Sequence, residues 1–97
     1  MSVAMIQGAA SKGLNAVPKH MALNDQETNR DANGGVATYC REQAIREIYL
    51  RPFEDALTEG EAMGVMSSMA RIGSMRCRSS YALNINVLRG EWGYEGF

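Results

Sequence analysis

Apolar residues recur every three or four positions in three stretches of the chain, which is the spacing of one face of an α-helix. The stretches span 2–12, 41–59 and 80–89, and each is followed by a glycine, the residue type that commonly ends a helix: Gly13, Gly60 and Gly90. We expect three helices. Their buried faces should carry Ile45, Ile48, Tyr49, Phe53, Ala56 and Leu57 in the second helix, and Tyr81, Ile85 and Leu88 in the third.

Two other apolar runs are too short for helices and are bounded by glycine or polar residues, as strands are. They cover 14–23 and 62–69, and the second has so few charges that we expect it to be covered on both faces. The polar segment 24–38 is long enough to be a functional loop, and we expect a second loop over 70–79.

Both prolines fall inside predicted elements, where each removes a backbone donor. Pro52 should kink the second helix near Tyr49, because its ring crowds the preceding turn. Pro18 counts against a strand over 14–23 unless its nitrogen points away from a pairing partner.

The predicted order is helix, strand, loop, helix, strand, loop, helix, which indicates an α/β fold with a parallel sheet and helical crossovers. We treat 1–97 as one piece, because the sequence contains no repeat or linker. Two strands do not form a parallel sheet that is stable alone, so we expect further strands to be missing from this sequence.

Composition excludes several classes of protein. Ten Lys and Arg residues against eleven Asp and Glu residues give a net charge of -1, which removes the positive field needed for nonspecific binding of nucleic acid or of anionic membranes. No run approaches a membrane span. The beginning of the chain lacks the features of a secretory signal, so we expect a cytoplasmic protein if Met1 is the natural start.

One histidine and two cysteines are too few for a zinc site, and we expect no cofactor. Cys40 and Cys77 should be free thiols without activation. Asp25 and Glu27 could act as general acid and base, but their alternate positions in a polar loop favour roles as ion partners or turn formers, with Glu27 paired to Arg30.

Two further groups have alternative interpretations. Arg71, Arg76 and Arg78 lie close in sequence to Tyr81 and could bind RNA, but the balanced charge elsewhere favours a solvated loop. The aromatic pair Trp92 and Tyr94 could stack on a sugar or could be buried against neighbouring elements.

Four blocks of the sequence resemble, in the correct order, the conserved blocks of family 3 glycoside hydrolases, and in particular of their β-glucosidase branch. The blocks are Lys19-His20 with Asn24-x-Gln26-Glu27-x-x-Arg30, then Arg46-Glu47-Ile48-Tyr49-Leu50-x-Pro52-Phe53-Glu54, then Gly64-Val65-Met66-Ser67-Ser68, then Leu88-Arg89-x-Glu91-Trp92-Gly93-Tyr94-x-Gly96-Phe97. The resemblance covers nearly the whole chain, and four ordered blocks are far more specific than any one of them.

The resemblance implies that the chain is a partial (β/α)8 TIM-barrel fragment, from a fold of roughly 250 residues with its active site at the carboxyl ends of the strands. It also implies a retaining β-glucosidase, which uses an Asp nucleophile and a Glu acid/base to hydrolyse terminal β-D-glucosyl residues. In the family the nucleophile lies on a strand directly after the block that ends at Phe97, and the acid/base belongs to a later domain. We therefore expect this chain to be inactive by itself.

The resemblance assigns part of the glycone-binding subsite to Lys19, His20 and Arg30, with a β-glucoside or a related saccharide as the ligand. An ammonium, an imidazole and a guanidinium suit sugar hydroxyls, which both donate and accept hydrogen bonds. The chain departs from the family pattern at Met69-Ala70, where an aromatic residue and Asn are common, and at Met21, where Phe or Tyr is usual. The alternative from another class is a small non-catalytic interaction or carbohydrate-binding α/β module.

Overall fold

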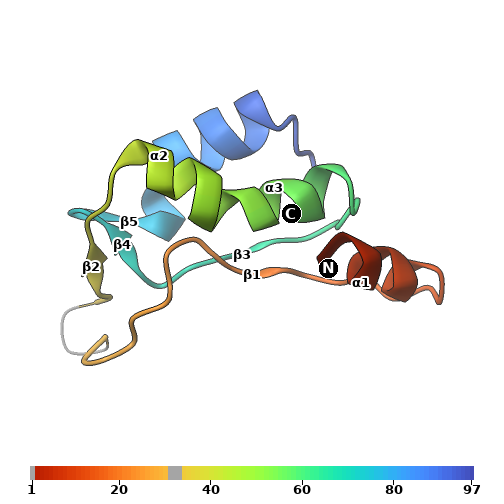
Figure 1. Ribbon diagram of the computed structural model, residues 1–97, viewed down its shortest axis with the longest axis horizontal. Helices are drawn as coiled ribbons and strands as arrows, with labels where there is room; N and C mark the ends of the chain where they lie inside the picture. The colour runs from red at the N-terminus through yellow and green to blue at the C-terminus, as the bar shows by residue number, and fades with distance from the viewer. Residues whose placement is uncertain (1, 31–33) are drawn as a thin grey trace.

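The computed structural model describes residues 2–30 and 34–97, and it keeps the predicted order of elements while adding three short strands (Figure 1). The helical segments are α1 (Ser2–Ala10), α2 (Glu42–Ala44), the π-helical η1 (Ile45–Leu50), α3 (Arg51–Thr58), the 3-10 helix η2 (Cys77–Ser79) and the π-helical η3 (Ala82–Glu91). The strands are β1 (Lys19–Met21), β2 (Ala37–Thr38), β3 (Met66–Ser67), β4 (Arg71–Ile72) and β5 (Met75–Arg76). Of the loop expected over 24–38, residues 31–33 lie outside the described residues.

The helix predicted over 2–12 is confirmed as α1, which ends in a turn at Gly13. Gly13 takes a φ of +74°, and its N–H donates to the carbonyl of Ala10 at 2.9 Å. Because the left-handed conformation costs glycine little, the chain can leave the helix at this point and turn back toward β1.

The predicted parallel pairing is confirmed between β1 and β3, with Lys19 opposite Met66 and Met21 opposite Ser67. Between these two pairs the chain moves two residues along β1 but only one along β3, so His20 is the extra residue of a β-bulge. The regular strands are much shorter than the predicted runs. Pro18 explains part of this: its carbonyl accepts a bond from Met66 N at 3.1 Å, so it faces β3, where its nitrogen has no hydrogen to donate.

A second, three-stranded sheet was not predicted. β2 pairs in parallel with β4, and β4 pairs in antiparallel with β5, across a two-residue turn in which Gly73 has a φ of +60°. The interpretation of 70–79 as a loop is therefore wrong. Each of these strands has two residues, too few to produce a visible alternation, although Gly-Ser between short runs is a known hairpin signal.

The predicted helix over 41–59 is continuous but changes type along its length. Its π-helical section, η1, lies just before Pro52, and Arg51 N donates to the carbonyl of Arg46, five residues earlier. The irregularity therefore falls in the region predicted from Pro52, which cannot donate an α-helical bond. The wider turns also change which residues are buried. Ala56 and Leu57 are buried as predicted, but Ile48 is 63% exposed, and Leu50, which was not predicted to be buried, lies in the core.

The last helix is also π-helical and continues through Gly90, which we had expected to end it. Its buried residues are Leu83, Val87 and Leu88, whereas Tyr81 and Ile85 are 69% and 43% exposed. The predicted buried face was therefore wrong for Tyr81 and Ile85. An i to i+5 bonding pattern brings residues four and five apart onto one face, which matches Leu83 with Val87 and Leu88.

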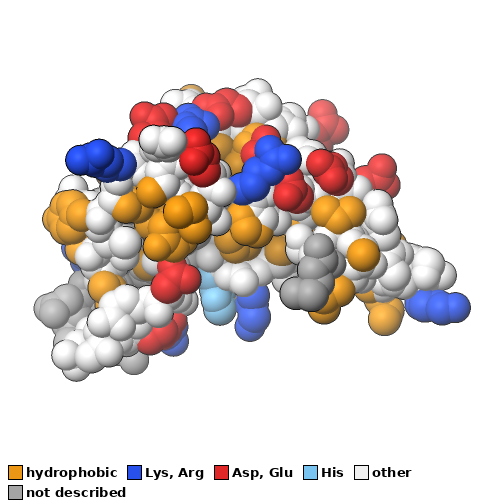
Figure 2. All heavy atoms as spheres, in the orientation of Figure 1, with side chains coloured by type: hydrophobic (Ala, Val, Ile, Leu, Met, Phe, Trp, Pro, Cys, Tyr) orange, Lys and Arg blue, Asp and Glu red, His pale blue; other side chains and the backbone are white. Residues whose placement is uncertain are grey.

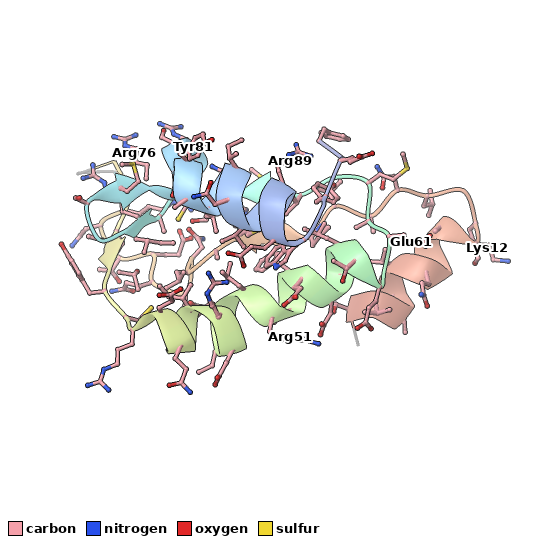
Figure 3. The ribbon with its side chains drawn as sticks, turned by 90° about the horizontal axis from the view of Figure 1, so that it is seen from above. Lys12, Arg51, Glu61, Arg76, Tyr81 and Arg89 are labelled. Atoms are coloured by element: carbon pink, nitrogen blue, oxygen red, sulfur yellow. The ribbon has the colours of Figure 1, made fainter. Side chains whose placement is uncertain are left out.

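The hydrophobic core lies between the β1–β3 sheet and the helices on one side of it (Figure 1). Seen from above, η3 and the helix formed by α2, η1 and α3 run alongside each other over the sheet (Figure 3). Strand residues Met21, Ala22 and Leu23 and helix residues Leu50, Leu57, Leu83 and Leu88 are all part of this core. On the outer surface of the helices, acidic side chains gather (Figure 2).

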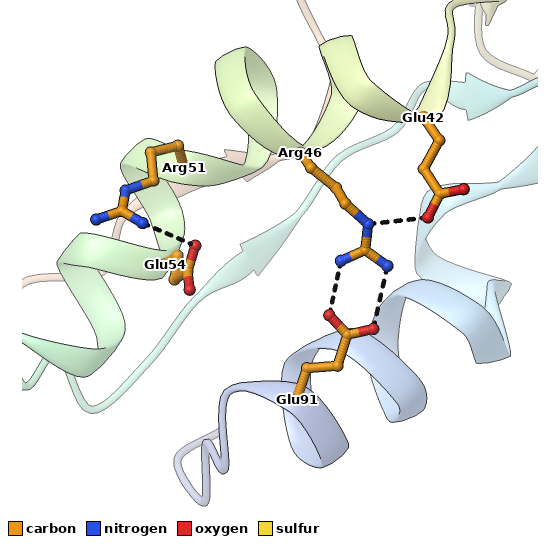
Figure 4. Close-up of polar contacts among 5 residues, drawn as sticks. All are labelled: Glu42, Arg46, Arg51, Glu54 and Glu91. Atoms are coloured by element: carbon orange, nitrogen blue, oxygen red, sulfur yellow. Dashed lines mark hydrogen bonds and ion pairs between the residues drawn. The ribbon is translucent and has the colours of Figure 1, made fainter.

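An ion pair joins the two neighbouring helices (Figure 4). The Arg46 guanidinium donates to both carboxylate oxygens of Glu91, Nη1 to Oε2 at 2.6 Å and Nη2 to Oε1 at 3.1 Å, and its Nε donates to Glu42 at 2.9 Å. Hydrogen bonding from Arg46 lowers the pKa of Glu91, and hydrogen bonding to Glu91 and Glu42 raises the pKa of Arg46. This bidentate ion pair fixes the position of η1 relative to η3.

We expect Glu91→Gln to lower the thermal midpoint of the chain at pH 7 by about 1–4 °C, because exposed ion pairs contribute little each. The pKa of Glu91 is lower in the folded chain than its ordinary value of 4.5, so its contribution is complete above that value and is lost as the pH falls through the folded pKa. In thermal melts of both proteins at falling pH, the difference between their midpoints should therefore begin to shrink below about pH 4.5. Glu54→Gln, which removes a pair within α3, is the matched control. A difference that does not shrink at any pH below 4.5 at which the chain stays folded contradicts this assignment.

Both cysteines are free thiols, as predicted. Cys77 is fully buried and its Sγ lies 3.5 Å from the carbonyl oxygen of Ala22, whereas Cys40 is partly exposed. With a thiol-specific chromophoric disulfide, we expect the Cys77→Ser protein to react at once and the Cys40→Ser protein to react only as fast as it unfolds. Equal rates for the two variants would show that the core around Cys77 is open.

Candidate functional site

Lys19 and His20 are the first two residues of β1, the short strand that leads through Met21 into the loop over 24–38. Lys19 is exposed and stands opposite Met66, and His20, the bulge residue, is partly buried. The peptide bonds Lys19–His20 and Met21–Ala22 are cis. A bulge changes the direction of a side chain relative to its neighbours, so the bulge in β1 determines how the imidazole is presented beside the ammonium.

A hollow of about 300 Å³ includes both residues in its lining. One wall consists of β1 and the segment after it, with Asn24 and Asp25, and the other consists of Tyr49 and Phe53 of the neighbouring helix. Polar groups on one side and aromatic rings on the other form a concave surface of mixed character, typical of a small-molecule site.

Arg30 is not among the residues that line this hollow. Its Nη1 lies 2.6 Å from Oε2 of Glu27, and Glu27 also accepts a hydrogen bond from the Asn24 amide. The expectation that Glu27 pairs with Arg30 is therefore confirmed. The structure brings Lys19 and His20 together and holds Arg30 in the adjoining loop, where Arg30 and Asn24 both contact Glu27.

The two loop carboxylates do not face one another as an acid/base pair. Asp25 lines the hollow beside Lys19 and His20, whereas Glu27 is engaged with Arg30 and Asn24. The interpretation as an ion partner is therefore confirmed for Glu27.

The arginines of the second sheet are tied to the loop that carries Arg30. Arg71 and Arg76 are cross-strand partners in β4 and β5, and Arg71 Nε donates to the carbonyl of Gly34 at 3.4 Å. A Cβ placed on Gly34 would collide with the Arg76 guanidinium, so that side chain packs directly against the glycine. Two of the three arginines considered for RNA binding therefore contact the protein's own backbone.

Tyr94 is buried and Trp92 packs against the core, as the structural alternative for this pair predicted. Arg89 Nη1 donates to the Tyr94 carbonyl at 2.7 Å, and its guanidinium lies 5.3 Å from the centre of the Tyr94 ring. Burial raises the pKa of the Tyr94 hydroxyl, and the nearby Arg89 charge opposes that rise. Sequence reasoning missed this contact, although an arginine five residues before an aromatic residue near a helix end was a usable signal.

Among residues 2–30 and 34–97, no three His, Cys, Asp or Glu side chains gather closely enough to hold a metal ion. In the same residues, every helix is too short or too polar to cross a bilayer.

The sequence matches, over residues 1–97, the family described as the glycosyl hydrolase family 3 N-terminal domain. It is 38% identical over 97 residues to a β-glucosidase of Ruminococcus albus, covering 100% of this chain and 10% of the relative. It is 41% identical over 91 residues to β-glucosidase B of Emericella nidulans, covering 94% of this chain and 10% of that protein. The chain thus spans about a tenth of the length of these relatives.

The solved structures that this chain resembles are also β-glucosidases. A β-glucosidase of Paenibacillus barengoltzii superposes with a TM-score of 0.91 at 41% identity, over 99% of this chain and 10% of that one. β-Glucosidase 3B of Thermotoga neapolitana, solved in complex with glucose, superposes with a TM-score of 0.89 at 41% identity, over 98% of this chain and 13% of that one. The family match and these similarities both extend along the whole sequence, so this chain belongs to glycoside hydrolase family 3, where it corresponds to a part of the N-terminal domain.

Proposed function

We propose that this chain forms part of the (β/α)8 barrel of a retaining β-glucosidase, and that Lys19, His20 and Arg30 bind the terminal glucosyl ring of the substrate. The observation that carries the proposal is that Lys19 and His20 are adjacent in β1, the parallel strand that leads into the loop over 24–38, and line one hollow, in a chain whose relatives include a β-glucosidase solved with glucose. In (β/α)8 barrels the active site lies at the carboxyl ends of the strands.

The chemistry of the three side chains supports sugar binding. A lysine ammonium offers three donors and no acceptor, and a neutral imidazole offers one of each, so the pair can donate to hydroxyl oxygens and also accept from one hydroxyl. Glu27 restrains the Arg30 guanidinium through an ion pair, which reduces the number of orientations that sugar binding has to freeze.

The arrangement of the chain is consistent with a segment of a parallel barrel. β1 and β3 are parallel and the helices lie on one side of them (Figure 1). Phe97 N donates to the carbonyl of Met63 at 3.2 Å, and Val65 N donates to the carbonyl of Phe97 at 2.9 Å. These two bonds have the pattern of a parallel ladder, so Phe97 takes the place of a third parallel strand beside the segment that leads into β3.

The carboxylates that act as nucleophile and acid/base in the family have no counterpart assigned in this chain. We therefore expect the purified 97-residue chain to show no hydrolysis of an aryl β-glucoside above the buffer rate. The Thermotoga neapolitana enzyme, assayed in parallel with the same substrate, provides the positive control. Robust turnover that co-purifies with the chain through two independent columns would show that it carries a complete active site.

The sugar-binding role is best tested in a complete enzyme. Residues 2–97 can replace the matching segment of the Paenibacillus barengoltzii β-glucosidase, to give a graft in which the remaining barrel comes from the relative. We expect the graft to hydrolyse an aryl β-glucoside, and Lys19→Ala or His20→Ala to lower its kcat/KM by about 10- to 150-fold, the effect of losing one hydrogen bond to a charged or strongly polar group.

Lys12→Ala is the matched control for the graft, because Lys12 is an exposed lysine in the turn after α1. It should leave kcat/KM unchanged. A folded but inactive graft would favour the alternative of a non-catalytic module, and equal effects of Lys12→Ala and Lys19→Ala would remove Lys19 from the subsite.

A further inference from the structure

Three segments of the chain meet at Gly64, which is buried between Val17 and Phe97. A Cβ built on Gly64 would lie 3.2 Å from Cγ2 of Val17 and 3.2 Å from Cζ of Phe97. The hydrogen bonds from Phe97 N to Met63 O and from Val65 N to Phe97 O make Phe97 the direct parallel partner of Gly64. Val17 and Phe97 therefore approach each other across the face of a glycine.

By the alternation of side chains, the face of the sheet on which they meet is the face that carries Lys19, opposite the face that the helices cover. Lys19 therefore borders both this face and the hollow that Tyr49 and Phe53 line. Side chains alternate along a strand, so Val17 and Lys19 share a face, and so do Gly64 and Met66. The register places Lys19 opposite Met66, which joins the two pairs into one surface. Val17 and Met66 are 43% and 47% exposed on this surface, in contrast to Met21, which is 1% exposed toward the helices.

Lys19 is two residues after Val17 on the same face of the strand, so its side chain lies roughly 7 Å along the strand from the side chains of Val17 and Phe97. A lysine side chain normally packs its four-carbon stem on apolar surface and extends its ammonium beyond it. Met66 offers such a surface beside Lys19, and Val17 and Phe97, which both lie over Gly64, offer one in the preceding row of side chains.

We propose that Val17, Gly64 and Phe97 form an apolar platform that positions the Lys19 ammonium for a sugar hydroxyl, and that the missing side chain of Gly64 sets the height of this platform. This inference rests on the proposed function, since it assigns a positioning role to residues that do not themselves bind the sugar. Without a side chain at 64, Val17 and Phe97 both reach over the glycine, and the outer side of the Phe97 ring remains exposed. With one, both must move outward by a few tenths of an ångström, into the space of the lysine stem.

The test uses the graft and the variants Gly64→Ala, Gly64→Ala with Val17→Ala, and Gly8→Ala. We expect Gly64→Ala to raise KM and the inhibition constant of glucose by about tenfold while kcat changes by less than about threefold, because the sugar loses a correctly placed donor. Adding Val17→Ala removes the Cγ2 atom that crowds the new methyl group, and it should restore both constants to within about threefold of the graft. Gly8→Ala, in α1 with no atom within 4 Å of the new methyl group, should leave them unchanged.

If Gly64→Ala does not fold in the graft, Phe97→Leu gives a second measurement, because it removes the ring from the platform without adding an atom in the crowded row. We expect it to raise the inhibition constant of glucose by about three- to tenfold at an unchanged thermal midpoint. An active graft in which Gly64→Ala or Phe97→Leu leaves glucose binding unchanged overturns the platform, and so does a Gly64→Ala loss that Val17→Ala fails to relieve. An inactive parent graft, in contrast, overturns the proposed function.

Discussion

The parallel pairing of β1 with β3 is the constraint on which the rest of the structure depends. Its backbone bonds include those from Met66 N to Pro18 O at 3.1 Å and from Ser68 N to Met21 O at 2.6 Å. These bonds bring together segments that are nearly fifty residues apart in sequence and create the surface on which both helices pack. Because β1 bulges at His20, the same pairing sets Met21 into the core and leaves Lys19 exposed. Core packing and the presentation of the candidate site therefore have one origin.

The order and type of the long elements could be predicted from sequence, because each depends on a pattern several turns or residues long. The predicted details failed where backbone geometry departs from the standard period. The π-helical sections η1 and η3 move Ile48, Tyr81 and Ile85 out of the faces that a 3.6-residue period assigns to them. The two-residue strands β2, β4 and β5 arise from tertiary pairing, and they are too short to show the alternation of apolar and polar residues that would predict a strand.

The candidate site likewise contains some residues that the sequence could identify and others that it could not. Lys19 and His20 could be found because they are adjacent in a recognisable motif, and the structure places both at one hollow. Arg30 carries the same family resemblance but has an ion pair with Glu27 and lies outside that lining. The contacts that hold the surrounding segments, such as Arg89 with Tyr94 and Arg46 with Glu91, join exposed and buried groups whose partners only the folded chain defines.

The small second sheet has a consequence for the loop that carries Arg30. β2 closes the far end of this loop by pairing with β4, and Arg71 Nε reaches back to the carbonyl of Gly34. Both ends of the loop are thereby anchored to the polypeptide on either side of Ala70, one to β3 through β1 and the other to β4. The position of the loop that carries Arg30 therefore depends on the β4–β5 hairpin, which lies much later in the sequence.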